Sequence, residues 1–193
     1  MLSIETEARV ARLLLTLAEG ERTNEISRQV LSDNYDFDPY QVFSYLDPDR
    51  KNRVTSGDIV NYLRSKGVCA SPLEGDLLVL FYDQDCDGAL SYCEFLNLVQ
   101  SQNSVSKNKT FSTNAELPFN VDYSLTKLLE KEINLCRDVV SILTDLRSRC
   151  DFNIHEIYHQ LKGCTWITLD SIKNFLERNN TSFLESDIQN ILK

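Results

Sequence analysis

The sequence predicts an all-α protein made of two similar helical lobes, each with a long leading helix, joined by a polar linker. Apolar residues recur at helical spacing through most of the chain, and only 6 of its 193 residues are glycine. Alternation typical of strands is limited to two or three residues inside loops. The hydrophobic fraction of 42% is sufficient for a packed core, which argues against wholesale disorder.

The helices are predicted from periodicity and from their start signals. The first is expected within residues 3–31, where Ile4, Ala8 and Ala11 begin an apolar series at helical spacing. Asp38 is placed to cap the next helix and Pro39 to occupy its first position, so that helix should run to about residue 46. Later helices are expected near residues 56–66, 73–82, 92–101, 121–149, 154–161, 169–179 and 185–192.

A polar segment rich in serine and asparagine covers residues 101–120 and is predicted to be a linker. It separates an N-terminal lobe, residues 1–100, from a C-terminal lobe, residues 121–193. Short blocks repeat in the same order in both lobes, which indicates a tandem duplication. The matching pairs include Asp36-Phe37 with Asp151-Phe152, Val54-Thr55 with Ile167-Thr168, and Asn61-Tyr62-Leu63 with Asn174-Phe175-Leu176.

One loop carries the chemistry: residues 83–94 follow the pattern D-x-D-x-D-G-x5-E. Calcium is a hard cation that takes about seven oxygen ligands at roughly 2.3–2.6 Å. Alternate residues of a tightly wound loop point inward, and Gly88 permits the left-handed backbone that the turn requires. The expected ligands are the side chains of Asp83, Asp85 and Asp87, the backbone carbonyl of Ala89, Ser91 directly or through water, and both carboxylate oxygens of Glu94.

The flanks of this loop agree with that interpretation. Apolar residues precede and follow it at helical spacing, and Leu90 is expected to pair by a short β-bridge with a neighbouring loop. Here the sequence resembles the EF-hand, calmodulin-like superfamily. The resemblance implies paired helix–loop–helix hands, one bound Ca²⁺, and a dissociation constant on the order of 10⁻⁷–10⁻⁵ M.

The partner loop of that pair should be residues 47–58, about 36 residues upstream. Asp47 is retained, but Lys51 stands at the third acidic position, Asn52 replaces the turn glycine and Asp58 replaces the glutamate. Two like charges about 4 Å apart repel by about 4 kcal/mol at an effective dielectric near 20. We interpret this loop as a structural partner that does not bind calcium; the alternative is weak binding with Lys51 turned outward.

A third loop, residues 162–171, is two residues shorter and lacks carboxylates at the early ligand positions, so it is not expected to hold calcium. Its Trp166 is expected to anchor packing or a partner. By the repeat, a fourth loop would begin after Lys193. Two hypotheses stay open: the loop follows in a further tail, or it has been lost and the third loop pairs with another chain.

Composition and motifs exclude several function classes. His155 and His159 lie at i, i+4 but without the order of a metalloprotease helix, and no glycine motif for phosphates occurs, so the chain is not expected to be an enzyme. A net charge of −9 argues against nucleic acid as a partner, and no apolar stretch reaches the ~20 residues of a membrane span. Six cysteines without a CxxC pair favour a reduced, cytoplasmic protein.

Two binding functions follow. The favoured one is a calcium-binding regulatory or structural subunit held by a protein partner in a stable complex, because the single methionine, Met1, argues against the pliable methionine-rich groove of calmodulin. The alternative is a calmodulin-like sensor that exposes an apolar surface to target helices. The two-lobed layout also resembles EF-hand proteins of ciliates and other flagellated protists, which implies a location in the cilium or cytoskeleton.

Overall fold

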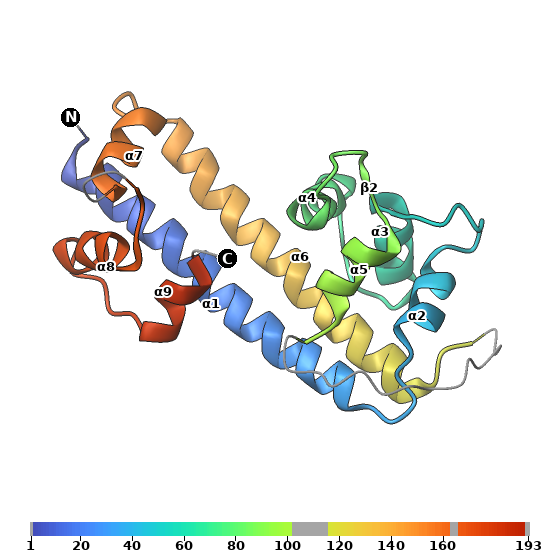
Figure 1. The fold of residues 1–193 in the computed structure, drawn as a ribbon. Helices are drawn as coiled ribbons and strands as arrows, with labels where there is room; N and C mark the ends of the chain where they lie inside the picture. The colour runs from blue at the N-terminus through green and yellow to red at the C-terminus, as the bar shows by residue number, and fades with distance from the viewer. Residues whose placement is uncertain (1, 102–115, 163–165, 192–193) are drawn as a thin grey trace. The chain divides into compact units, whose positions relative to one another are not determined.

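The computed structural model describes residues 2–101, 116–162 and 166–191. These residues are mostly helical, which confirms the predicted all-α class (Figure 1). They form the elements α1 (Ile4–Asp33), α2 (Pro39–Leu46), β1 (Val54–Thr55), α3 (Ser56–Ser65), α4 (Pro72–Tyr82), β2 (Ala89–Leu90), α5 (Tyr92–Val99), α6 (Phe119–Arg147), α7 (Ile154–Leu161), α8 (Leu169–Arg178) and α9 (Glu185–Ile191).

The chain divides into two compact units that differ from the two predicted lobes. One unit is residues 23–136; the other combines residues 1–22 with residues 137–193. The boundaries therefore fall inside α1 and α6, because each long helix contributes apolar residues to both cores. Most of the predicted linker, residues 102–115, lies outside the described residues.

Two helix–loop–helix segments form the centre of the 23–136 unit. The first is α2, β1 and α3, and the second is α4, β2 and α5. Their loops are joined by an antiparallel pairing in which Val54 faces Leu90 and Thr55 faces Ala89. The predicted bridge at Leu90 is thereby confirmed. Leu90, Phe95 and Leu98 are completely buried in the core of this unit, so the pairing is fixed by packing as well as by hydrogen bonds.

The helix starts are set by side-chain caps. Asp38 accepts a hydrogen bond from the Tyr40 backbone N–H at 3.0 Å with Pro39 at the first helical position, as the sequence predicted. Reciprocal capping boxes begin the next three helices of this unit, α3, α4 and α5. They join Thr55 with Asp58 at α3, Ser71 with Glu74 at α4, and Ser91 with Glu94 at α5.

Gly75 allows α4 to approach α3 closely. A Cβ atom at this position would lie 2.6 Å from a methyl carbon of Val60 and 3.1 Å from the backbone oxygen of Ser56. A side chain there would force Val60 to move and the backbone at Ser56 to give slightly. The close contact brings α4, which leads into the 83–94 loop, against the helix that leaves the first loop.

A buried polar network joins four helices of the same unit. Arg28 of α1 donates to Glu132 of α6 at 2.8 Å, and both side chains are only 3% exposed. Tyr82, the last residue of α4, donates to the same carboxylate oxygen at 2.8 Å. Arg28 also donates to the backbone carbonyl of Leu98 in α5 at 3.0 Å. The helices on both sides of the 83–94 loop are therefore held to the long helices by one ionic centre.

The other unit has its own core, to which α7, α8 and α9 contribute. Phe175, Leu176 and Ile188 pack there with apolar residues of α1 and α6. Asp151 fixes the start of α1, since its carboxylate accepts the backbone N–H of Ser3 at 2.7 Å and the hydroxyl of Thr6 at 2.8 Å.

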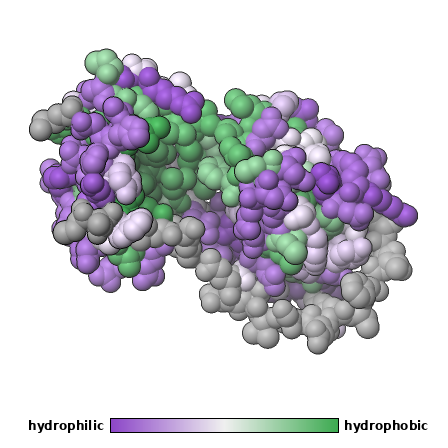
Figure 2. All heavy atoms as spheres, turned by 45° about the horizontal axis from the view of Figure 1, so that its top comes forward, coloured by the Kyte–Doolittle hydropathy of each residue, from purple (hydrophilic) through white to green (hydrophobic). Residues whose placement is uncertain are grey.

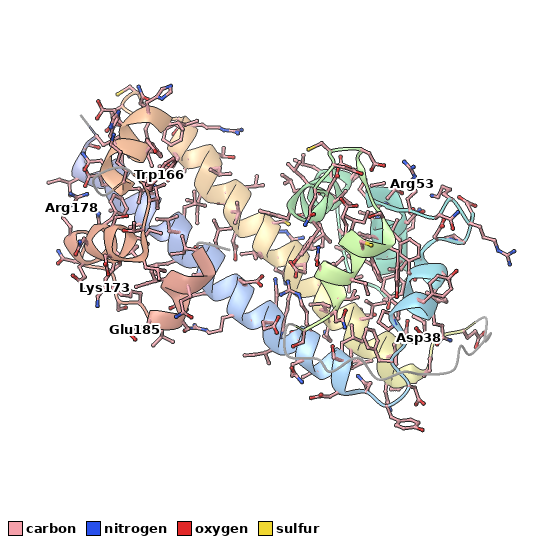
Figure 3. The ribbon with its side chains drawn as sticks, in the orientation of Figure 1. Asp38, Arg53, Trp166, Lys173, Arg178 and Glu185 are labelled. Carbon is pink, nitrogen blue, oxygen red and sulfur yellow. The ribbon has the colours of Figure 1, made fainter. Side chains whose placement is uncertain are left out.

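The predicted third loop is seen only in part, because residues 163–165 lie outside the described residues. Trp166 is 74% exposed, so it does not anchor packing within its unit (Figure 3).

Figure 2 shows hydrophobic side chains interrupting a largely hydrophilic surface on the face it draws. Within the described ranges, no helix has the length and apolar character needed to cross a bilayer.

Candidate metal centre

The 83–94 loop connects the C-terminus of α4 with the N-terminus of α5. Asp83 ends α4 and Ser91 caps α5, so the two helices fix both ends of the loop. Between them the side chains of Asp83, Asp85 and Asp87 converge, with one oxygen of each lying within 4.8 Å of the others. Three of the predicted ligands are thus brought together by the structure.

The backbone of this loop winds around the carboxylate of Asp83. One oxygen accepts the N–H of Asp87 at 3.3 Å, and the other accepts the N–H of Gly88 at 2.9 Å. Gly88 has a φ of 84°, the left-handed conformation predicted from the motif, and Cys86 has a φ of 60°. The tight turn directs backbone N–H groups towards Asp83, and these hydrogen bonds hold the Asp83 side chain in place.

The remaining predicted ligands lie beside the aspartate group rather than in it. Glu94 joins the two ends of the loop, because one of its oxygens accepts the N–H of Gln84 at 2.8 Å and the other accepts the N–H of Ser91 at 2.9 Å. The Ser91 hydroxyl donates to Glu94 at 2.7 Å. Ala89 belongs to β2 and its N–H donates to Asp87 at 3.0 Å.

Electrostatics distinguish the carboxylates of the loop. At Asp85 the backbone N–H of Asp87 acts to lower the pKa, but desolvation and the negative charges of Asp87 and Glu94 outweigh it, so the pKa is raised. The pKa of Glu94 is lowered, chiefly by the Ser91 hydroxyl and the backbone N–H groups that it accepts. The loop therefore concentrates negative charge that a cation would neutralise.

The donor set fits a hard divalent cation. Three carboxylates converge, a fourth stands at the start of the exit helix, and residues 83–94 contain no histidine. Calcium and magnesium prefer such oxygen ligands, and calcium tolerates the flexible geometry of a loop better than magnesium does. Asp83, Asp85, Asp87 and Glu94 are the residues that would hold the ion, whose role is to neutralise and cross-link these carboxylates.

The 47–58 loop has left-handed residues, Arg50 and Asn52, at the positions where the 83–94 loop has Cys86 and Gly88, but it also contains a lysine. Asn52 has a φ of 57° where Gly88 has 84°, and Asp47 accepts the N–H groups of Lys51 and Asn52 at 3.0 and 2.7 Å. The Lys51 ammonium lies 3.0 Å from a carboxylate oxygen of Asp58, at the end of this loop. The ammonium is therefore directed at a carboxylate of its own loop and is not turned away from it.

An ion pair that the sequence analysis missed connects the two loops. Arg53 donates from Nη1 to Oδ2 of Asp87 at 3.0 Å (Figure 3 labels Arg53). Arg53 directly precedes β1, and the pairing of Val54 with Leu90 brings it to the second loop. The predicted β-bridge could have identified this contact, because a pairing of Val54 with Leu90 places the preceding residue, Arg53, beside the second loop.

Comparisons with protein-family models, with curated proteins and with solved structures return no match to this chain. The case for the site thus depends on its own residues.

His155 and His159 are exposed on α7. In the part of the chain that the structure describes, the cluster of potential metal ligands is Asp83, Asp85 and Asp87. Cysteines 69, 86, 93, 136 and 150 have free thiols.

Proposed function

We propose that the 83–94 loop binds one Ca²⁺ and that the chain is an EF-hand regulatory or structural subunit without catalytic activity of its own. The observation that carries this proposal is the convergence of Asp83, Asp85 and Asp87 around the turn at Gly88, between two capped helices. The paired 47–58 loop supports it, because a second loop with the same backbone conformation is what an EF-hand pair requires.

Calcium binding is tested by isothermal titration of the full chain. We expect one site, and we expect Glu94→Gln to weaken binding by at least about tenfold, because a bidentate charged ligand becomes a neutral one. Asp49→Asn is the matched control: Asp49 is an exposed acid of the 47–58 loop, and its substitution should leave the affinity unchanged. Absence of heat and of any stabilisation at millimolar calcium would contradict the proposal.

A protein partner is the second part of the proposal. Leu73, Leu80 and Phe81 are all at least half exposed on α4, the helix that enters the calcium loop. Several exposed large apolar residues on one helix favour a protein contact. With one methionine in the chain, a single lasting partner suits this surface better than many exchanging targets. The resemblance noted above extends the proposal to a cytoskeletal or ciliary assembly in the cytoplasm.

The alternative is a sensor that exposes apolar surface when calcium binds, and two measurements separate it from a structural subunit. A sensor should gain binding of a hydrophobic dye at micromolar calcium, whereas a structural subunit should gain thermal stability and little dye binding. A ligand at 100 times its dissociation constant adds about 2.7 kcal/mol to the free energy of unfolding. A native pull-down from the source cells, followed by mass spectrometry, would identify the partner.

A further inference from the structure

Asp87 is a candidate calcium ligand that also forms an ion pair with a residue of the neighbouring loop. Its Oδ1 accepts the N–H of Ala89 at 3.0 Å, inside its own loop. Its Oδ2 accepts the guanidinium of Arg53 at 3.0 Å, from the neighbouring loop. The ion pair therefore engages one of the two carboxylate oxygens with which Asp87 could bind an ion.

The position of Arg53 is set by the sheet and not by the length of its side chain alone. It lies next to Val54, whose pairing with Leu90 fixes the register of the two loops. Val54 and Leu90 are completely buried, so a slip of the register would expose both. The packing of the core therefore places the guanidinium of Arg53 beside the 83–94 loop.

We propose that Arg53 is an internal competitor of calcium that sets the affinity of the 83–94 loop. This inference rests on the calcium site proposed above. A guanidinium and a calcium ion both seek the carboxylate of Asp87, and the positive charge of Arg53 repels an ion at the neighbouring carboxylates. Calcium binding therefore requires Arg53 to release or share Asp87. The free energy of the Arg53–Asp87 ion pair is then subtracted from the free energy of calcium binding, which lowers the apparent affinity.

The strength of the pair gives the size of the effect. Arg53 and Asp87 are 51% and 41% exposed, so solvent screens their attraction. Exposed ion pairs of this kind contribute about 0.2–1 kcal/mol, which corresponds to an affinity change of about 1.4- to 5-fold. Arg53 thus adjusts the affinity without closing the site.

The experiment compares calcium titrations of the full wild-type chain with those of Arg53→Met and Arg50→Met. Arg50 lies in the same loop, is exposed, and forms no ion pair with the residues that the structure describes, so its substitution removes the same charge without the contact. We expect Arg53→Met to bind calcium about 1.4- to fivefold more tightly than wild type, and in every case more tightly than Arg50→Met, which should stay close to wild type. Arg53→Lys, which keeps the charge, should stay close to wild type.

Salt provides an independent measurement. The difference between wild type and Arg53→Met should shrink as sodium chloride rises from about 20 mM to 500 mM, because exposed charges are screened. If wild type binds calcium but Arg53→Met binds no more tightly than Arg50→Met, Arg53 is not a competitor, and the calcium site itself stands. If neither wild type nor the variants bind calcium, both the site and the competition are wrong.

Discussion

The buried network around Glu132 gives the sharpest stability prediction. Substitution of Glu132 by Gln keeps the volume and an acceptor but removes the negative charge that faces Arg28, with both side chains 3% exposed. Removing one partner of a buried ion pair costs about 3–5 kcal/mol, because the remaining charge loses its partner; here Arg28 keeps a longer contact with Glu25 at 3.4 Å. The amide oxygen can still accept from Arg28 and Tyr82, so the loss should lie at the lower end, about 3 kcal/mol.

The assay is urea unfolding of the full chain, followed by far-UV circular dichroism. With a slope of about 2 kcal/mol per molar urea, a loss of 3 kcal/mol lowers the midpoint of the 23–136 unit by about 1.5 M. The matched control is Glu130→Gln on the same helix. Glu130 pairs with Lys127 at 2.6 Å on the surface, and the midpoint should not change measurably.

A double variant separates the effect of charge from the effect of shape. Arg28→Met combined with Glu132→Leu replaces the ion pair by apolar side chains of similar size, and such a replacement is often neutral or stabilising. We expect the double variant to unfold at a higher urea concentration than Glu132→Gln. A midpoint for Glu132→Gln within 0.3 M of wild type would refute the reasoning, since the buried charge would then need no partner.

Three further predictions concern other parts of the structure. Gly75→Ala should lower the free energy of unfolding by about 1–2 kcal/mol in chemical denaturation, because the clash with Val60 exceeds the gain in helix propensity; an increase would contradict the close packing. Lys51→Asp should lower the melting temperature by leaving Asp58 among like charges, and calcium at millimolar concentration should restore it in differential scanning fluorimetry; an unchanged melting temperature would count against Lys51 as the internal cation. The pKa of Asp151 is lowered by the hydrogen bonds from Ser3 and Thr6, so its contribution is present above its ordinary value near 4 and is lost as pH falls below it. Asp151→Asn should therefore show a smaller fall in melting temperature between pH 5 and pH 3 than wild type by calorimetry, and equal falls would disprove this.

Local features of the fold were predictable because their causes lie within a few residues. Asp38 and Pro39 specify a helix start through one side-chain oxygen and one fixed φ, and both are found where the sequence placed them. The turn at Gly88 and the left-handed Asn52 follow from the same local rule. Apolar spacing placed each helix within a few residues of its observed bounds.

Contacts between distant segments were not predictable in this way. The pair of Arg53 with Asp87 depends on the register of the sheet, and the pair of Arg28 with Glu132 depends on how two long helices face each other. The division into units was also missed, because periodicity shows that a helix exists but not which core each half of it joins. For the site, the sequence named the converging aspartates and the cation Lys51, but not Arg53, the cation that pairs with Asp87.

Glu94 has a consequence for how fast the loop can respond. Its two oxygens tie Gln84, near the first position, to Ser91, near the last, so hydrogen bonds of the protein itself already close the ring of backbone. A calcium ion would then replace a few side-chain hydrogen bonds and would not have to order a flexible loop. Association in stopped-flow mixing should therefore approach the diffusion limit, with the helical circular dichroism signal unchanged before and after.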